Sequence, residues 1–233
     1  MKKTFIYILT VLLALTAGNL EAKNVKRETI TLDSKIKYIV NNTTAKIIAS
    51  QGSKDEMNLE VDEDIFDKVK IKQEGNKVYI SLESGNYYNI KRFNVFITLK
   101  EVKGIKTVGS GDILTTGQIK TNDFTLLIEG SGDARITNII SEKITIAIFG
   151  SGDVTAAGTT NEFNCEIQGT GDVNAIKVTA KNANVKISGN GDCAIDAIDS
   201  LAMQIFGSGD VYIKNSPLKL TSSIKGQGEL KFW

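Results

Sequence analysis

The sequence contains no histidine and only one proline, Pro217, among its 233 residues. Without histidine the chain cannot build a Ser-His-Asp triad or a zinc site with histidine ligands. The scarcity of proline leaves backbone hydrogen-bond ladders almost uninterrupted. Cysteine is also scarce, and the separation of Cys165 from Cys193 fits no CxxC metal or redox motif.

An excess of charge of one sign is missing as well. The chain has 28 Lys and Arg against 27 Asp and Glu, a formal net charge of +1. Binding to nucleic acid depends on an excess of basic residues that meets the phosphates, so we expect no nucleic-acid partner. Hydrophobic residues make up 41% and charged residues 24% of the chain, which is typical of a folded globular protein.

Residues 1–22 have the features of a signal peptide. Lys2 and Lys3 precede an apolar run from Phe5 to Ala17, which is shorter than a comfortable membrane span. Cleavage after Ala22 would leave equal numbers of acidic and basic residues and no second long apolar run. We therefore expect an exported protein, periplasmic, on the outer surface or secreted, with no membrane span after signal cleavage.

A Gly-x-Gly-acid element repeats seven times from residue 109 onward, at intervals of 18–21 residues. Fourteen of the 21 glycines lie in these elements. A period near 20 residues is the size of one solenoid rung. Glycine suits a sharp corner that needs a positive φ or a close approach of two chain segments, and the acid can cap exposed amides of its own corner. The predicted structural corner residues are Gly109, Gly111, Asp112, Gly130, Gly132, Asp133, Gly150, Gly152, Asp153, Gly169, Gly171, Asp172, Gly189, Gly191, Asp192, Gly207, Gly209, Asp210, Gly226, Gly228 and Glu229.

Apolar residues occupy alternate positions on both sides of each corner, a period that is typical of strands with one buried face. The same slot recurs in every rung, so its side chains should stack about 4.8 Å apart in a buried column. The pattern predicts an all-β solenoid. The column that we expect two residues before each corner contains Ile128, Ile148, Ile167, Ile187 and Ile205.

The segment before the first corner is less regular. Lys46–Ser50 before Gln51-Gly52 resembles a degenerate first rung, and alternation on either side of Glu74-Gly75-Asn76 predicts a hairpin. We expect another strand at Asn94–Leu99 and a turn or single helical turn at Asp62–Asp67.

No low-complexity linker divides the chain. The expected organisation is a signal peptide at 1–22, an N-terminal β region at 23–108 that continues into the solenoid, and a regular solenoid of seven rungs at 109–233.

The order of these features resembles the putative auto-transporter adhesin, head GIN domain family. The resemblance covers roughly residues 27–230 and rests on Val61-Asp62-Glu63-Asp64, the hairpin around Gly75-Asn76, the strand at 94–98 and the serial Gly-Ser-Gly-Asp turns. The sequence departs from the family at Leu99, where proline is frequent, and at Glu229, which ends the last repeat. The resemblance implies a right-handed single-stranded β-helix and a secreted or envelope protein of a Gram-negative bacterium.

The series of acids at the corners admits two interpretations. A ladder of carboxylates about 5 Å apart could attract Ca²⁺. Calcium β-rolls supply several ligands per turn, however, whereas this repeat supplies one acid, and we favour corner capping over a metal site. The even spacing also provides no pair of carboxylates in contrasting environments, so we expect no catalytic residues and no cofactor.

A candidate recognition loop lies at Gly85–Asn89, followed by Lys91 and Arg92. Exposed tyrosines can stack on sugars or pack against protein, so Tyr87, Tyr88 and Arg92 are the candidate binding residues. The alternative is that one tyrosine only covers the edge of the solenoid.

The cysteines occupy inward slots on strands on opposite sides of a corner. Facing sheets lie about 10 Å apart, which is too far for a disulfide, so two buried free thiols are expected. At the C-terminus we expect Phe232 and Trp233 to plug the open core of the last rung.

Taken together, the sequence predicts a non-catalytic exported solenoid that binds protein or glycan at the cell envelope, as an adhesin-like module. A polysaccharide lyase or glycosidase on the same scaffold and a structural envelope component are the alternatives.

Overall fold

The computed structural model describes residues 24–233, so the signal peptide expected at 1–22 lies outside the described residues. Strands account for nearly all of the regular structure, and the one helical element is a single turn at Glu63–Phe66, within the segment where a turn was expected. In chain order the elements are β1 (Val25–Thr31), β2 (Tyr38–Asn41), β3 (Lys46–Gln51), β4 (Glu56–Asp62), α1 (Glu63–Phe66), β5 (Val69–Glu74), β6 (Lys77–Leu82), β7 (Phe93–Leu99), β8 (Gly104–Gly109), β9 (Ile113–Thr116), β10 (Ile119–Gly130), β11 (Ala134–Gly150), β12 (Val154–Gly169), β13 (Val173–Gly189), β14 (Cys193–Gly207), β15 (Val211–Ile213), β16 (Lys219–Gly226) and β17 (Leu230–Phe232).

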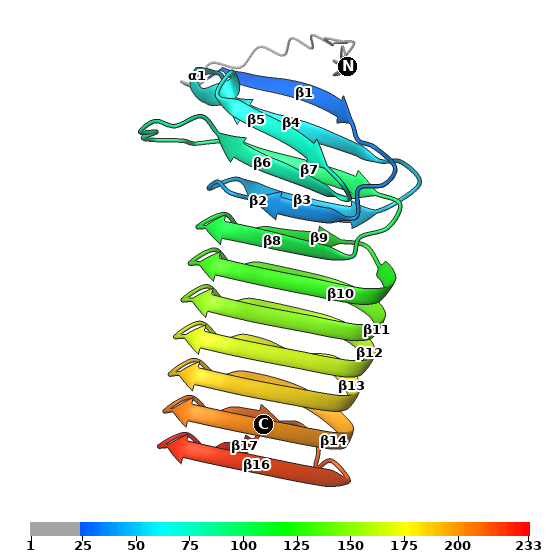
Figure 1. The fold of residues 1–233 in the computed structure, drawn as a ribbon, viewed down its shortest axis with the longest axis vertical. Helices are drawn as coiled ribbons and strands as arrows, with labels where there is room; N and C mark the ends of the chain where they lie inside the picture. The colour runs from blue at the N-terminus through cyan, green and yellow to red at the C-terminus, as the bar shows by residue number, and fades with distance from the viewer. Residues whose placement is uncertain (1–23) are drawn as a thin grey trace.

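The chain winds into a flattened β-solenoid whose rungs stack along one axis (Figure 1). From β8 onward, each rung has a longer front segment that ends at a Gly-x-Gly corner and a shorter back segment that follows it. The front segments of β10 to β14 pair in parallel with one another, and β16 is the last strand of the front sheet that they form. The back segments end with β15 and β17 and form the back sheet. The predicted all-β solenoid with rungs of about 20 residues is therefore confirmed.

The predicted isoleucine column is confirmed by the pairing register. Ile128 pairs with Ile148, which pairs in turn with Ile167, and the series continues through Ile187 and Ile205. All five side chains are buried in the core between the two sheets. Because the inward slot recurs in every rung, each rung covers apolar surface that its neighbour would otherwise expose to water.

The two glycines of a corner differ in backbone conformation, although both lie against the backbone of the neighbouring rung. Gly150, the first glycine of its corner, has φ of 147°, a conformation that side chains disfavour. Gly152, the second, does not have a positive φ, so of the two predicted reasons only the close approach of chain segments applies to it. A Cβ atom at Gly152 would lie 2.1 Å from the carbonyl oxygen of Gly132 in the neighbouring rung. The second glycine is needed because successive corners stack backbone on backbone.

The first rung turns at a different place from the one expected. β2 and β3 form its front and back segments, and the corner is the turn at 42–45 rather than Gln51-Gly52. The side chain of Asn41 organises this turn without glycine: its Nδ2 donates to the Ala45 carbonyl at 2.9 Å, and its Oδ1 accepts from the Thr43 amide at 3.1 Å. Gly111 of the next corner packs directly against this turn, and a Cβ atom at Gly111 would lie only 2.4 Å from Asn41 Nδ2.

Strands of the N-terminal part cover the end of the stack. β5 and β6 form the predicted antiparallel hairpin, and β6 extends the front sheet by pairing in parallel with β2. β7 extends the back sheet by pairing in parallel with β3, and β4 lies antiparallel between β7 and β1. Within residues 24–233, no helix is long and apolar enough to cross a membrane.

The cysteines lie closer together than expected. Cys165 and Cys193 are both buried and carry free thiols. A hydrogen bond between the two thiols, together with burial, raises the pKa of Cys165 well above its usual value. The predicted separation across the core is therefore wrong, because side chains from the two sheets meet between them.

The C-terminal aromatics do not plug the core. Trp233 is 65% exposed and packs edge to face against Tyr212, with 6.0 Å between the ring centroids. Phe232 pairs with Ile213 across β15 and β17 and is also exposed.

Candidate functional site

The predicted recognition loop replaces one corner of the solenoid. Residues 83–92 connect β6 to β7, which pair with β2 and β3 respectively. The loop therefore occupies the rung position next to the turn at 42–45, and it projects from the stack at the corner edge (Figure 1). A cleft of about 400 Å³ separates it from the first two corners and is lined by Thr43, Tyr87, Tyr88 and Gly109, among others.

The two tyrosines of the loop have different environments. Tyr87 donates from its hydroxyl to the Glu83 carbonyl at 2.7 Å, and its ring lies against Gly85. Tyr88 is 78% exposed. Asn89, the next residue, has φ of 57°, the left-handed conformation that asparagine tolerates better than most residues. Tyr87 therefore holds the loop closed on itself, and Tyr88 is the ring that a partner can reach.

Arg92 is not part of this cleft. Its positive charge acts on Glu60 of β4. Burial works to raise the pKa of Glu60, but a hydrogen bond from Arg27, a second one from Asn94 and the nearby Arg92 together lower it below its usual value. Of the three candidate binding residues, the structure brings together the two tyrosines and separates Arg92 from them.

The corner acids form a hydrogen-bonded ladder between rungs. Oδ1 of each aspartate accepts from the backbone amide of the acid in the next rung, from Asp112 to the amide of Glu229, at 2.7–3.0 Å. The expected cap within one corner is thus a contact from one rung to the next. Among residues 24–233, no three His, Cys, Asp or Glu side chains are grouped in a way that could hold a metal ion.

The last aspartate of the ladder also has a basic partner. Asp210 accepts hydrogen bonds from Lys231, which lowers the pKa of the carboxyl group despite an opposing contribution from burial. The ion pair lies at the end of the stack, beside the last back strand.

A groove of about 770 Å³ follows the edge opposite the corners. Its walls mix charged, polar and apolar side chains from successive rungs, including Lys120, Ile140, Glu142, Asn161, Lys181 and Ile198. Ile140 and Ile198 are both exposed. We call this feature the edge groove.

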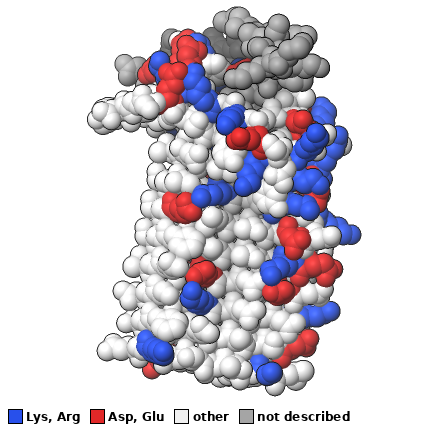
Figure 2. Space-filling model, in the orientation of Figure 1, with Lys and Arg blue, Asp and Glu red and all other residues white. Residues whose placement is uncertain are grey.

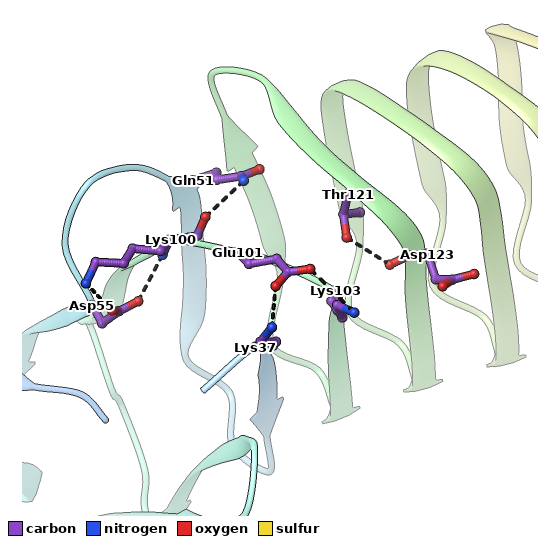
Figure 3. A network of polar contacts seen from close by, with 8 residues as sticks. All are labelled: Lys37, Gln51, Asp55, Lys100, Glu101, Lys103, Thr121 and Asp123. Atoms are coloured by element: carbon purple, nitrogen blue, oxygen red, sulfur yellow. Dashed lines mark hydrogen bonds and ion pairs between the residues drawn. The ribbon is translucent and has the colours of Figure 1, made fainter. Parts of the chain in front are cut away.

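A polar network fixes the N-terminal wall of the edge groove (Figure 3). Gln51 donates to the Lys100 carbonyl at 3.0 Å and accepts from the Lys120 amide at 2.7 Å, which ties three segments together. Asp55 accepts from the Lys100 amide at 2.9 Å. Glu101 pairs with Lys37 and Lys103, and the hydrogen bond from Lys37 lowers the pKa of this acid.

A second depression, of about 380 Å³, lies on the outer surface of the front sheet. We call it the front hollow; its lining includes Thr145, Ala147, Asn164, Asn184, Ala202 and Gln204. The surrounding face carries few charged side chains, and these are mostly in pairs of opposite sign (Figure 2).

The sequence analysis missed both the edge groove and the front hollow, because neither contains a local motif. Their side chains are about 20 residues apart in the chain and meet only when the rungs stack. The front hollow could have been found from the repeat itself. Five positions before the first corner glycine, the outward residues are Thr125, Thr145, Asn164, Asn184, Ala202 and Thr221, a row of small and polar side chains.

Comparison with solved structures identifies similar folds in Bacteroides and Parabacteroides species. A putative adhesin from Bacteroides fragilis superposes with a TM-score of 0.87 at 22% identity, covering 91% of this chain and 98% of that one. A putative lipid-binding protein from Parabacteroides distasonis gives a TM-score of 0.74 at 22% identity, with 90% and 97% covered. A putative adhesin from Parabacteroides merdae gives 0.70 at 21% identity, with 90% and 96% covered. At these identities the similarity shows the fold alone.

Comparison with curated protein sequences found no match. The family model described as putative auto-transporter adhesin, head GIN domain, in contrast, matches residues 35–217, which span most of the rungs and both N-terminal hairpin strands. The chain belongs to the family of putative auto-transporter adhesins with a head GIN domain.

Proposed function

We propose that this protein is an exported, non-catalytic binding module that recognises protein or glycan at the cell envelope, whether in the periplasm, on the outer surface or after secretion. The observation that carries the proposal is the loop at 83–92, where a tight corner is replaced by a projecting segment with Tyr88 exposed above a cleft. An exposed tyrosine offers a large rigid contact area at low entropic cost. The description of the family as adhesins and the resemblance of residues 1–22 to a signal peptide support the same role.

The distribution of the acids is the reason to prefer binding over catalysis. Retaining and inverting glycosidases need two carboxyl groups across one bond, with environments that separate their pKa values. In the corner ladder, every aspartate from Asp112 to Asp192 has the same backbone partner one rung away. Equivalent positions cannot divide the roles of acid and base among themselves.

The loop also argues against a purely structural role. A stalk or spacer needs only regular corners, and the turn at 42–45 shows that a rung of this solenoid can turn without glycine and without an insertion. The longer loop at 83–92 adds exposed aromatic surface that the stack does not need.

The test compares two single-residue variants of the mature chain. Mature protein is immobilised and used to capture ligands from envelope extracts and from a glycan array. Tyr88→Ala should weaken binding of any captured ligand about tenfold, the usual effect of removing an aromatic anchor. Phe232→Ala, which removes another exposed ring at the far end of the solenoid, is the matched control and should leave binding unchanged. Equal binding by Tyr88→Ala and the parent protein would refute this role for the loop.

A further inference from the structure

The front hollow is formed by the side chains that the repeat places on the outward face of the front sheet. Thr145 and Ala147 lie on β11, Asn164 on β12, Asn184 on β13, and Ala202 and Gln204 on β14. The register aligns these positions across the rungs, since Thr145 pairs with Asn164, Asn164 with Asn184 and Asn184 with Ala202. The small side chains of Ala147 and Ala202 lower the floor of the surface and leave the amides as its prominent groups.

The amides of the hollow are held in position by one another. Asn184 Nδ2 donates to Asn164 Oδ1 at 3.0 Å, and Asn164 Nδ2 donates to Glu162 at 3.0 Å. A side-chain amide has two donors and an acceptor oxygen with two lone pairs, so one hydrogen bond in each direction leaves further capacity directed at solvent. The result is a pair of fixed amides on adjacent rungs, about 4.8 Å apart.

The hollow carries almost no net charge. Its lining includes one pair of opposite charges, Glu166 and Lys186, whose oxygen and nitrogen lie 3.0 Å apart. Hydrogen bonds from Lys186 and Gln168 lower the pKa of Glu166, which favours the charged carboxylate beside the lysine. A polyanion would find no excess of positive charge here, whereas uncharged hydroxyl groups can bond to either member of the pair.

Two exposed aromatic rings lie at the margin of the hollow toward the corners. Phe149 follows Ala147 and Phe206 follows Gln204 at the next outward position, and both are more than a third exposed. The register places Gln168 and Ser188 between them, so the two rings are three rungs apart, roughly 14 Å along the axis. Lys225 lies over the Phe206 ring at 5.6 Å, which keeps that ring in place on the surface.

We propose that the front hollow binds a neutral linear polysaccharide that lies along the solenoid axis. Its repeating hydroxyl groups bond to the paired amides of Asn164 and Asn184 and to Gln204, which lies on the next rung beside Lys186, and its apolar ring faces stack on Phe149 and Phe206. Aromatic rings favour such contacts because they offer flat apolar area at low entropic cost. A repeating ligand suits this surface because the surface itself repeats in one direction.

This site is separate from the loop at 83–92 and gives the proposed binding role a second surface with a defined ligand class. It rests on the proposed function only in that an exported protein meets polysaccharide outside the cytoplasm. Failure of the loop to bind a partner would leave the front hollow untouched, and the reverse also holds.

The experiment uses the mature chain and immobilised neutral oligosaccharides of increasing length, made of β-1,4-linked glucose, mannose or N-acetylglucosamine. We expect binding to at least one series, with affinity that rises with length until the chain reaches both phenylalanines. Ala202→Trp fills the floor of the hollow from an exposed position and should weaken binding at least about tenfold. Thr155→Trp, at an exposed position of the back segment of β12, is the matched control and should bind like the parent protein. Tyr88→Ala should also bind like the parent.

Gln204→Ala provides a second variant that removes an amide without adding bulk, should Ala202→Trp fold poorly, and its expected effect is a loss of about fivefold. Absence of binding to all three neutral series would overturn the proposal. So would equal affinity of the parent, Ala202→Trp and Gln204→Ala, or binding restricted to anionic oligosaccharides or to polypeptides.

Discussion

The corner stack allows a quantitative prediction for a single methyl group. Gly152→Ala adds a Cβ atom where the Gly132 carbonyl oxygen would be only 2.1 Å away, and the atoms in the way are backbone. Relief requires the two corners to separate by roughly 1 Å, since nonbonded carbon and oxygen atoms rarely approach closer than about 3.2 Å. Ser151→Ala is the matched control. It also places a methyl group in the corner, one residue earlier, but at an exposed position where this backbone contact does not arise.

The separation would stretch the hydrogen bonds that join these corners. Ser151 donates to the Gly130 carbonyl at 2.9 Å, and the Asp153 amide donates to Asp133 at 2.9 Å. Each such bond contributes about 1 kcal/mol, and displaced packing in the core beneath the corner adds a similar amount. We expect Gly152→Ala to lower the free energy of unfolding by about 3 kcal/mol, which corresponds to roughly 6–12 °C in melting temperature for a chain of this size.

Urea denaturation followed by circular dichroism measures this difference directly. The slope of the transition should stay constant, because the same surface is exposed on unfolding in both variants. Ser151→Ala should remain within about 0.5 kcal/mol of the parent. If Gly152→Ala matched Ser151→Ala within that margin, the second glycine of the corner would not be needed for backbone contact, and the account of the stack would be wrong.

Three further predictions concern the core, the thiols and one acid. Ile167→Asp should abolish cooperative folding or lower the free energy of unfolding by several kcal/mol, because it buries an unpaired charge in the central column. Ile198→Asp, at an exposed position, is the control and should have little effect. Equal melting curves for the two variants would contradict the register. Titration of the denatured, unreduced protein with a thiol reagent should find two reactive groups, because both cysteines are buried and the raised pKa of Cys165 disfavours its reactive thiolate form; a count of zero would refute this. The pKa of Glu101 is lower in the folded than in the unfolded state, so this carboxylate stabilises the fold above the unfolded pKa near 4.3, and the stabilisation is lost as pH falls through the folded pKa. Glu101→Gln should therefore make the free energy of unfolding less dependent on pH in the acid range. An unchanged pH dependence would count against the ion pair with Lys37.

The regular rungs were predictable from the sequence because their interactions repeat at one spacing. Once the corners were recognised, the inward slots followed from alternation, as the column around Ile167 shows. The first rung escaped the same reasoning, since its turn relies on the side chain of Asn41 instead of glycine. The sequence also left the neighbour of Gly152 unidentified, because the oxygen that excludes a side chain belongs to another rung, about 20 residues away.

For the candidate sites as well, features set by local sequence could be predicted, whereas features set by contacts between distant segments could not. Tyr88 could be predicted as exposed from its position in a polar loop, but the place of Arg92 depends on β4, a strand that the sequence did not predict. The contact between Cys165 and Cys193 depends on how far the two sheets are offset along the axis, which no local pattern encodes. The front hollow is encoded in the outward half of the alternation, but outward positions do not build a core and so carry no apolar signal that marks them.

The order of the rungs in space differs from their order in the chain, and this has a consequence for how the protein folds. The rung of β2 and β3 has a later rung on each side: the rung of β6 and β7 on one side and the rung of β8 and β9 on the other. Residues 38–51 are therefore enclosed by segments that follow them in the chain. Tyr38 meets Gly104 only after a long excursion of the chain, whereas each later rung closes a loop of about 20 residues onto a template that already exists. Formation of long-range contacts is the slow step in β topologies. We therefore expect the rung of β2 and β3 to close more slowly than any later rung, each of which needs only its nearest neighbour in the chain to pair.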